Sequence, residues 1–193
     1  MDPDATLRAV TEAAPFRAAV AALAADHDRM IADIVTLTEI PAPPFHEAAR
    51  AQAWMRMAAE QELGEIRQDA VGSVTALRRG AGGGDLLCVA AHLDTVFPPE
   101  TEVRVRRHGT RLLGPGIGDD TRSLAVLLAL ARAMDQAGVR TGRDILFVAD
   151  VGEEGAGDLR GMRHLFQHGE YAGRIGAFIN PNLYGALGVK EFL

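Results

Sequence analysis

Residues 86–94 read LLCVAAHLD, and the fold can be inferred outward from these nine residues. The first six residues, 86–91, are apolar without interruption, which is typical of a strand buried on both faces of a sheet. Residues 144–149 (DILFVA) have the same character, and an apolar helix is expected between the two runs, over 123–136. Strands that alternate with helices predict an α/β fold, here a three-layer α/β/α domain with a mostly parallel mixed sheet.

The flanking segments extend this pattern. Apolar residues recur at helical spacing over 16–39, which predicts one long helix that ends at the prolines of 40–44 (IPAPP). The other expected elements are a helix over 47–62, two short strands within 64–79 around a turn at 71–73, an alternating strand over 103–106, a helix over 159–167 and a strand that begins at 176. With 193 residues, the chain is long enough for one domain with a sizeable core.

The composition excludes several classes of protein. The net charge of −6 argues against a nucleic-acid platform, and the basic patch of Arg104, Arg106 and Arg107 is interpreted as a solvated strand or hairpin face. Cys88 is the single cysteine, so a buried thiol is expected and an intramolecular disulfide is not. No secretory signal is visible, and the most apolar helix, 124–134, is shorter than the about 20 residues that span a bilayer. We therefore expect a cytoplasmic protein that partners neither nucleic acid nor membrane.

Three short segments place His, Asp or Glu where an apolar run ends or a helix begins. They are 91–95 (AHLDT), 116–120 (GIGDD) and 151–155 (VGEEG). In an open α/β sheet, ligands bind beyond the carboxyl ends of the strands, so the three segments are expected to meet at one edge. One imidazole and several carboxylates are the ligand chemistry of a hydrolytic zinc site.

Each segment also has an ordinary structural explanation. A histidine after a strand is commonly a hydrogen-bonded structural residue, Asp119 and Asp120 would cap the helix that follows them, and the glutamates would form an exposed turn. The glycine-rich stretch 114–118 (GPGIG) has a superficial likeness to a dinucleotide-binding loop. It lacks the third glycine at the required spacing, and the two aspartates after it would repel a pyrophosphate. The coincidence of all three segments favours a metal site.

Together the three segments resemble a known family, the di-zinc amidohydrolases and exopeptidases. That family includes aminoacylase, carboxypeptidase G, tripeptidase, acetylornithine deacetylase and succinyl-diaminopimelate desuccinylase. The matching residues are 92–96 (HLDTV), 114–120 (GPGIGDD) and 152–155 (GEEG), and the resemblance covers about 16–179. It implies a zinc-exopeptidase-like fold and metal-dependent hydrolysis of amide or peptide bonds in small peptides or N-acyl amino acids.

The resemblance also implies a role for each matching residue. His92, Asp119 and Glu154 would be metal ligands, with Asp119 bridging two zinc ions; cobalt or manganese would suit the same ligands. Asp94 would hydrogen-bond the other ring nitrogen of His92 and fix its tautomer. Glu153 would be the general base that takes a proton from the attacking water.

The chain departs from the family pattern in three places. The family supplies a further carboxylate ligand two to three dozen residues after the glutamate pair, where this chain has Asn180 or Asn182. The lysine that commonly follows the paired aspartates is Thr121, although the peptide bond between 119 and 120 is still expected to be cis. We expect 1–193 to be the amino-terminal part of a catalytic domain, without the lid or dimerisation domain and the carboxy-terminal part, so that a dimer is expected only of an intact relative. The alternative is a truncated, catalytically inactive metal-binding remnant.

Overall fold

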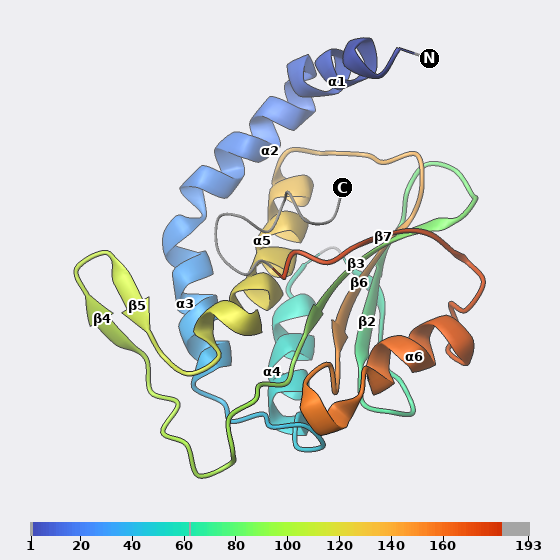
Figure 1. The fold of residues 1–193 in the computed structure, drawn as a ribbon. Helices are drawn as coiled ribbons and strands as arrows, with labels where there is room; N and C mark the ends of the chain where they lie inside the picture. The colour runs from blue at the N-terminus through green and yellow to red at the C-terminus, as the bar shows by residue number, and fades with distance from the viewer. Residues whose placement is uncertain (1, 62, 183–193) are drawn as a thin grey trace.

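A sheet of five strands forms the centre of the structure, a computed structural model that describes residues 2–61 and 63–182 (Figure 1). The strands are β1 (Gly64–Gln68), β2 (Val74–Arg78), β3 (Leu86–His92), β6 (Ile145–Asp150) and β7 (Ile175–Ile179), in the order β1-β2-β6-β3-β7. Strands β6, β3 and β7 run parallel, whereas β2 pairs with β6, and β1 with β2, in the antiparallel sense. The predicted α/β fold with a mixed sheet is therefore confirmed.

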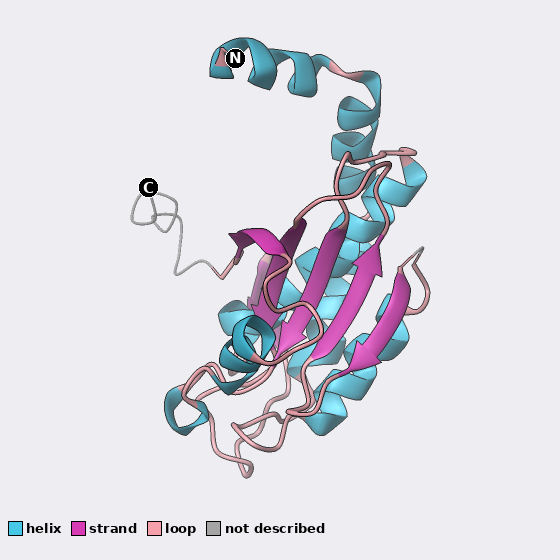
Figure 2. Cartoon of the chain, turned by 90° about the vertical axis from the view of Figure 1, so that its right-hand side faces the viewer, coloured by secondary structure: helices cyan, strands magenta, loops and turns pink. Residues whose placement is uncertain are grey.

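Helices cover both faces of this sheet, as Figure 2 shows. They are α1 (Pro3–Glu12), α2 (Ala14–Ala25), α3 (His27–Thr38), α4 (Ala48–Ala58), α5 (Arg122–Gln136) and α6 (Arg160–Gln167). Successive side chains of a strand point to opposite faces, so Phe147 packs in the cluster formed with α3, α4 and α5, whereas Leu146 packs in the one formed with α6. Cys88 is buried in the second cluster, as expected.

The amino-terminal helical region differs from the prediction. The single helix expected over 16–39 is two helices, α2 and α3, and α1 precedes them. The helical dihedral angles are interrupted at Asp26 (φ −81°, ψ 3°), whose carboxylate lies 2.6 Å from a guanidinium nitrogen of Arg132 on α5. Arg132 also lies 2.9 Å from Asp33 of α3, so a tertiary ion-pair network, which helical periodicity does not encode, accompanies the break.

The strand expected over 103–106 is also wrong. Residues 103–105 lie outside any strand, and the N–H of Val105 donates to the carboxylate of Glu39 (3.0 Å) instead of to a neighbouring strand. The local hairpin lies further along, with β4 (Arg106–His108) paired to β5 (Arg111–Leu113). The arginines at 104, 106 and 107 are exposed, as expected. Over residues 2–61 and 63–182, no helix is both long and apolar enough to span a membrane.

Candidate metal centre

The first and third acidic segments meet at one edge of the sheet because their strands are parallel neighbours. His92 is the last residue of β3 and pairs in register with Asp150, the last residue of β6. The ligand atoms of His92, Glu153 and Glu154 all lie within 4.8 Å of one another. The second segment joins them, because Oδ1 of Asp119 lies 2.9 Å from Nε2 of His92. The structure thus brings together the predicted ligands and the predicted base.

Asp94 holds this arrangement from two sides. Its backbone carbonyl lies 2.9 Å from Nδ1 of His92, so Nδ1 donates and Nε2 is left to face Asp119. Its carboxylate lies farther from the ring, 3.7 Å from Nδ1, and accepts the backbone N–H groups of Glu153 (3.0 Å) and Glu154 (2.8 Å). Burial raises the pKa of Asp94, but the nearby ring of His92 and the hydrogen bonds from these two amides outweigh it and lower the pKa. One residue, Asp94, therefore connects His92 at the end of β3 to the loop that carries Glu153 and Glu154, the glutamate loop.

The loop of residues 116–120, the aspartate loop, is held by its backbone conformation and by a contact with β3. The peptide bond between Asp119 and Asp120 is cis, as expected from the resemblance. The carboxylate of Asp120 accepts the backbone N–H of His92 (3.1 Å), which connects the loop to the end of β3. Gly116 has φ +74°, and a Cβ there would lie 2.5 Å from a methyl carbon of Thr95, so only glycine fits this turn without a shift.

Buried carboxylates surround the imidazole. Burial lowers the pKa of His92, but hydrogen bonds to Asp119 and Asp94, and the charges of Asp120 and Asp150, outweigh this and raise it to about 11. Burial raises the pKa of Asp150 to about 7 and that of Asp120 to about 6. Sequence reasoning missed both as parts of the site. The sequence could have pointed to both, because Asp150 ends an apolar strand and Asp120 follows Asp119 directly.

The donor set fits a bound cation. Burial raises the pKa of Glu154, and the charges of Glu153 and Asp119 add to this effect, so anionic oxygens are held close together. One oxygen each of Asp120 and Asp150 is buried without a hydrogen-bond partner. A cation among these groups would offset their mutual repulsion, and an imidazole with carboxylates suits zinc, cobalt or manganese.

Of the two asparagines considered from the sequence, the structure brings Asn182 to the site. Its amide nitrogen lies 3.2 Å from Nε2 of His92 and 3.2 Å from Oδ1 of Asp119. The side chain of Asn180 instead accepts the backbone N–H of Asn182 (2.8 Å). An asparagine side chain also carries an amide oxygen, which is a neutral donor in place of a carboxylate.

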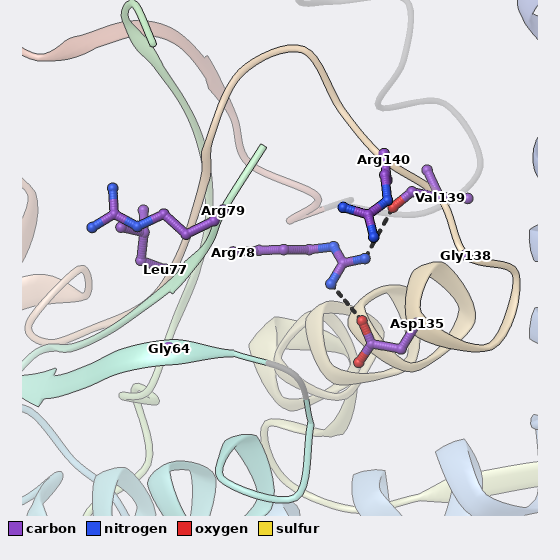
Figure 3. Close-up of a pocket in the computed structure, with 8 residues that line it drawn as sticks. All are labelled: Gly64, Leu77, Arg78, Arg79, Asp135, Gly138, Val139 and Arg140. Atoms are coloured by element: carbon purple, nitrogen blue, oxygen red, sulfur yellow. Dashed lines mark hydrogen bonds and ion pairs between the residues drawn. The ribbon is translucent and has the colours of Figure 1, made fainter. Parts of the chain in front are cut away.

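A pocket of about 380 Å³ lies at the opposite edge of the sheet, and an ion pair between Arg78 and Asp135 forms part of its lining (Figure 3). Arg78, which stands opposite the first residue of β6, lies 2.5 Å from Asp135 and donates to the carbonyl of Val139 (3.0 Å). Figure 3 also shows the side chain of Arg79 directed away from this pair. The pocket contains none of the predicted site residues, and its ion pairing indicates a structural role.

Comparison with known proteins identifies the family. The model of peptidase family M20/M25/M40 matches residues 88–189, which is more than half of the chain. The chain belongs to this family. The match begins in β3 and takes in all three acidic segments of the site. A search of curated proteins found no match.

Solved structures of family members and other peptidases share the fold. The dipeptidase Dug1p from Saccharomyces cerevisiae matches with a TM-score of 0.68 and 12% identity, over 85% of this chain and 40% of that one. A tripeptidase from Staphylococcus aureus matches with a TM-score of 0.60 and 18% identity, over 71% and 40%. A dinuclear metal-binding M20 peptidase from Bacillus subtilis matches with a TM-score of 0.55 and 17% identity, over 81% and 43%. The chain therefore spans about two fifths of the length of these structures.

Proposed function

We propose that this chain carries the metal centre of a hydrolase that cleaves amide or peptide bonds in small peptides or N-acyl amino acids. The observation that carries the proposal is the cluster of His92, Glu153 and Glu154, whose ligand atoms lie within 4.8 Å of one another beside Asp119. Family membership supports the reaction class. The dinuclear metal-binding relative supports a metal cofactor.

His92, Asp119 and Glu154 would hold the metal, with two zinc ions as the expected complement and cobalt or manganese as alternatives. When bound, the metal would polarise the substrate carbonyl and lower the pKa of the attacking water. Nδ1 of His92 is engaged by the carbonyl of Asp94, so Nε2 would be the ring nitrogen that binds the metal.

Glu153 would act as the general base. Its half-buried carboxylate lies in the same cluster as the ligands, where it would take the proton of the attacking water and pass it to the leaving amine. Asp94 would position it, because the carboxylate of Asp94 accepts the backbone N–H of Glu153 (3.0 Å). The adjacent Glu154 is held in the same way, so one anchor serves both base and ligand.

The test is zinc binding and hydrolysis by the purified chain. Protein freed of metal is titrated with Zn²⁺ and assayed on dipeptides and N-acetyl amino acids. In Glu153→Gln we expect zinc to bind and turnover to fall about 10²–10⁴-fold, the usual contribution of a general base. Glu102→Gln, an exposed glutamate outside the cluster, is the matched control and should change neither quantity. Failure to bind zinc at all would overturn the proposal.

A second candidate function, metal binding without turnover, is favoured by Asn182. This neutral side chain lies 3.2 Å from both His92 and Asp119, where the family resemblance calls for a carboxylate. Replacing it in Asn182→Asp adds an anionic donor and should tighten zinc binding about tenfold or more. Zinc binding with no hydrolysis in either the original chain or Asn182→Asp would decide for the second candidate.

A further inference from the structure

His164 of α6 and His168, the residue that caps the carboxyl end of this helix, form a pair (the α6 pair) that shares no residue with the proposed metal centre. His164 and His168 are four residues apart, the spacing that places side chains on one face of a helix. The helical turn persists between them, because the N–H of His168 donates to the carbonyl of His164 (2.9 Å). Their ring centroids lie 6.3 Å apart with the ring planes tilted by 49°.

Both histidines line the same pocket of about 320 Å³ between α6 and β1. Asp69 and Glu170 line it as well. Arg67 is the cation in this lining, and its charge is offset by Glu170, whose oxygen lies 2.7 Å from the guanidinium. The pocket also sits at the carboxyl end of α6, where the helix dipole favours positive charge.

We propose that His164 and His168 chelate one divalent transition-metal ion of the Cu²⁺, Ni²⁺ or Zn²⁺ type. An ion about 2.0–2.1 Å from each ligand nitrogen would lie roughly 3.2 Å from each ring centroid, so a bond angle of about 90–110° at the metal places the centroids about 4.5–5.2 Å apart. The separation of 6.3 Å is larger, so the two rings must turn toward each other to share an ion. His168 is exposed, which leaves its ring room to turn.

The two metal sites differ in their donors. The α6 pair offers two imidazoles, which suit copper, nickel and zinc, whereas the proposed centre offers one imidazole among carboxylates. Magnesium and calcium take oxygen ligands, so neither should compete at the α6 pair. Copper is expected to bind most tightly, because affinity for a given nitrogen site peaks at Cu²⁺.

The test is titration of the full chain with Cu²⁺, followed by calorimetry and by electron paramagnetic resonance. We expect one copper ion with nitrogen hyperfine structure from two imidazoles, undisturbed by excess Mg²⁺, and distinct from any copper at the proposed centre, which has a single imidazole. His164→Ala and His168→Ala should each weaken this binding about tenfold or more, since one anchored ligand raises the effective concentration of the other. Both changes should leave the zinc affinity of the proposed centre unaltered.

The matched control is His108→Ala, which removes an exposed histidine of the β4–β5 hairpin and should change nothing. Circular dichroism of each variant checks that the fold persists. A two-imidazole copper signal that survives both α6 replacements, or spectra of the original chain that contain only single-imidazole copper, would overturn the proposal. Loss of zinc binding at His92 with copper binding at α6 intact would instead count against the proposed function alone.

Discussion

The two edges of the central sheet treat their acidic side chains in opposite ways. At the carboxyl edge, Asp119, Glu153 and Glu154 gather around one imidazole, that of His92. At the other edge, Asp135 lies 2.5 Å from a nitrogen of the largely buried Arg78. A carboxylate with its own arginine partner needs no further positive charge. Several carboxylates around a single imidazole repel one another, and a bound cation would offset that repulsion. The same residue types thus form a structural ion pair at one edge and the proposed metal centre at the other.

Breaking the ion-paired edge should have the largest effect on stability. In Asp135→Ala, Arg78 keeps its charge but loses its carboxylate partner, and side chains exposed by only 11% and 15% gain little help from solvent. The free energy of unfolding should fall by about 3 kcal/mol, measured by urea denaturation. Zinc binding by the folded protein should be unchanged, which separates the two edges.

The control is an exposed ion pair of the same kind. Asp158→Asn removes the partner of Arg163, and both side chains are more than half exposed. The expected loss is below about 0.5 kcal/mol, as for most surface pairs. Equal losses in the two variants would contradict the structural role assigned to the Arg78 pair.

The carboxyl edge should make the metal-free protein less stable as pH rises. The pKa of Asp150 is raised from 3.8 to about 7 in the folded chain, which keeps a proton that the unfolded chain releases above about pH 4. The pKa of His92, raised from 6.5 to about 11, acts in the same direction above pH 6.5. Urea denaturation in the presence of a chelator should show a fall of at least about 1 kcal/mol between pH 5 and pH 8. A flat or rising profile would contradict the charge distribution described for this edge.

Neutralising one acid at the carboxyl edge should have the reverse effect of Asp135→Ala. Burial, Glu153 and Asp119 all raise the pKa of Glu154, so its ionised form is disfavoured in the metal-free fold. Glu154→Gln should therefore increase the free energy of unfolding without metal by about 0.5 kcal/mol. With zinc present the order should invert, because the variant loses a ligand. Thermal unfolding of the variant and of the original chain, with and without zinc, measures the stability difference in each condition.

The smallest expected effect is on the rate at which a thiol reagent labels Cys88, which lies on β3 between the two edges. Burial raises the pKa of its thiol to about 12, so the reactive thiolate is scarce in the folded protein at pH 8. Labelling by a thiol reagent should follow unfolding, and should be faster in Asp135→Ala than in the original chain. Rapid labelling of the folded protein would show that the sheet opens locally around β3.

Several features of the fold and site were predictable because they depend on neighbours in sequence. The apolar runs before His92 and within β6 predicted buried strands, and their parallel order predicted that the residues after them share an edge. Asp26 shows the limit of this reasoning. Its helical surroundings predicted a continuous helix, but its ion pair with Arg132 of α5 accompanies a break. The hairpin at β4 and β5 was misplaced for a similar reason, since Val105 bonds to Glu39 instead of to a strand.

The layered α/β fold, the family and the three segments that supply the candidate site could all be inferred from the amino-acid sequence. These follow from local periodicity and from motif order. The packed structure was needed to show that Asn182, and not Asn180, lies against His92, and that the carboxylate of Asp94 holds the glutamate loop. It alone placed His164 and His168 on one pocket. Such contacts join segments far apart in the chain, and their distances arise only when the layers pack.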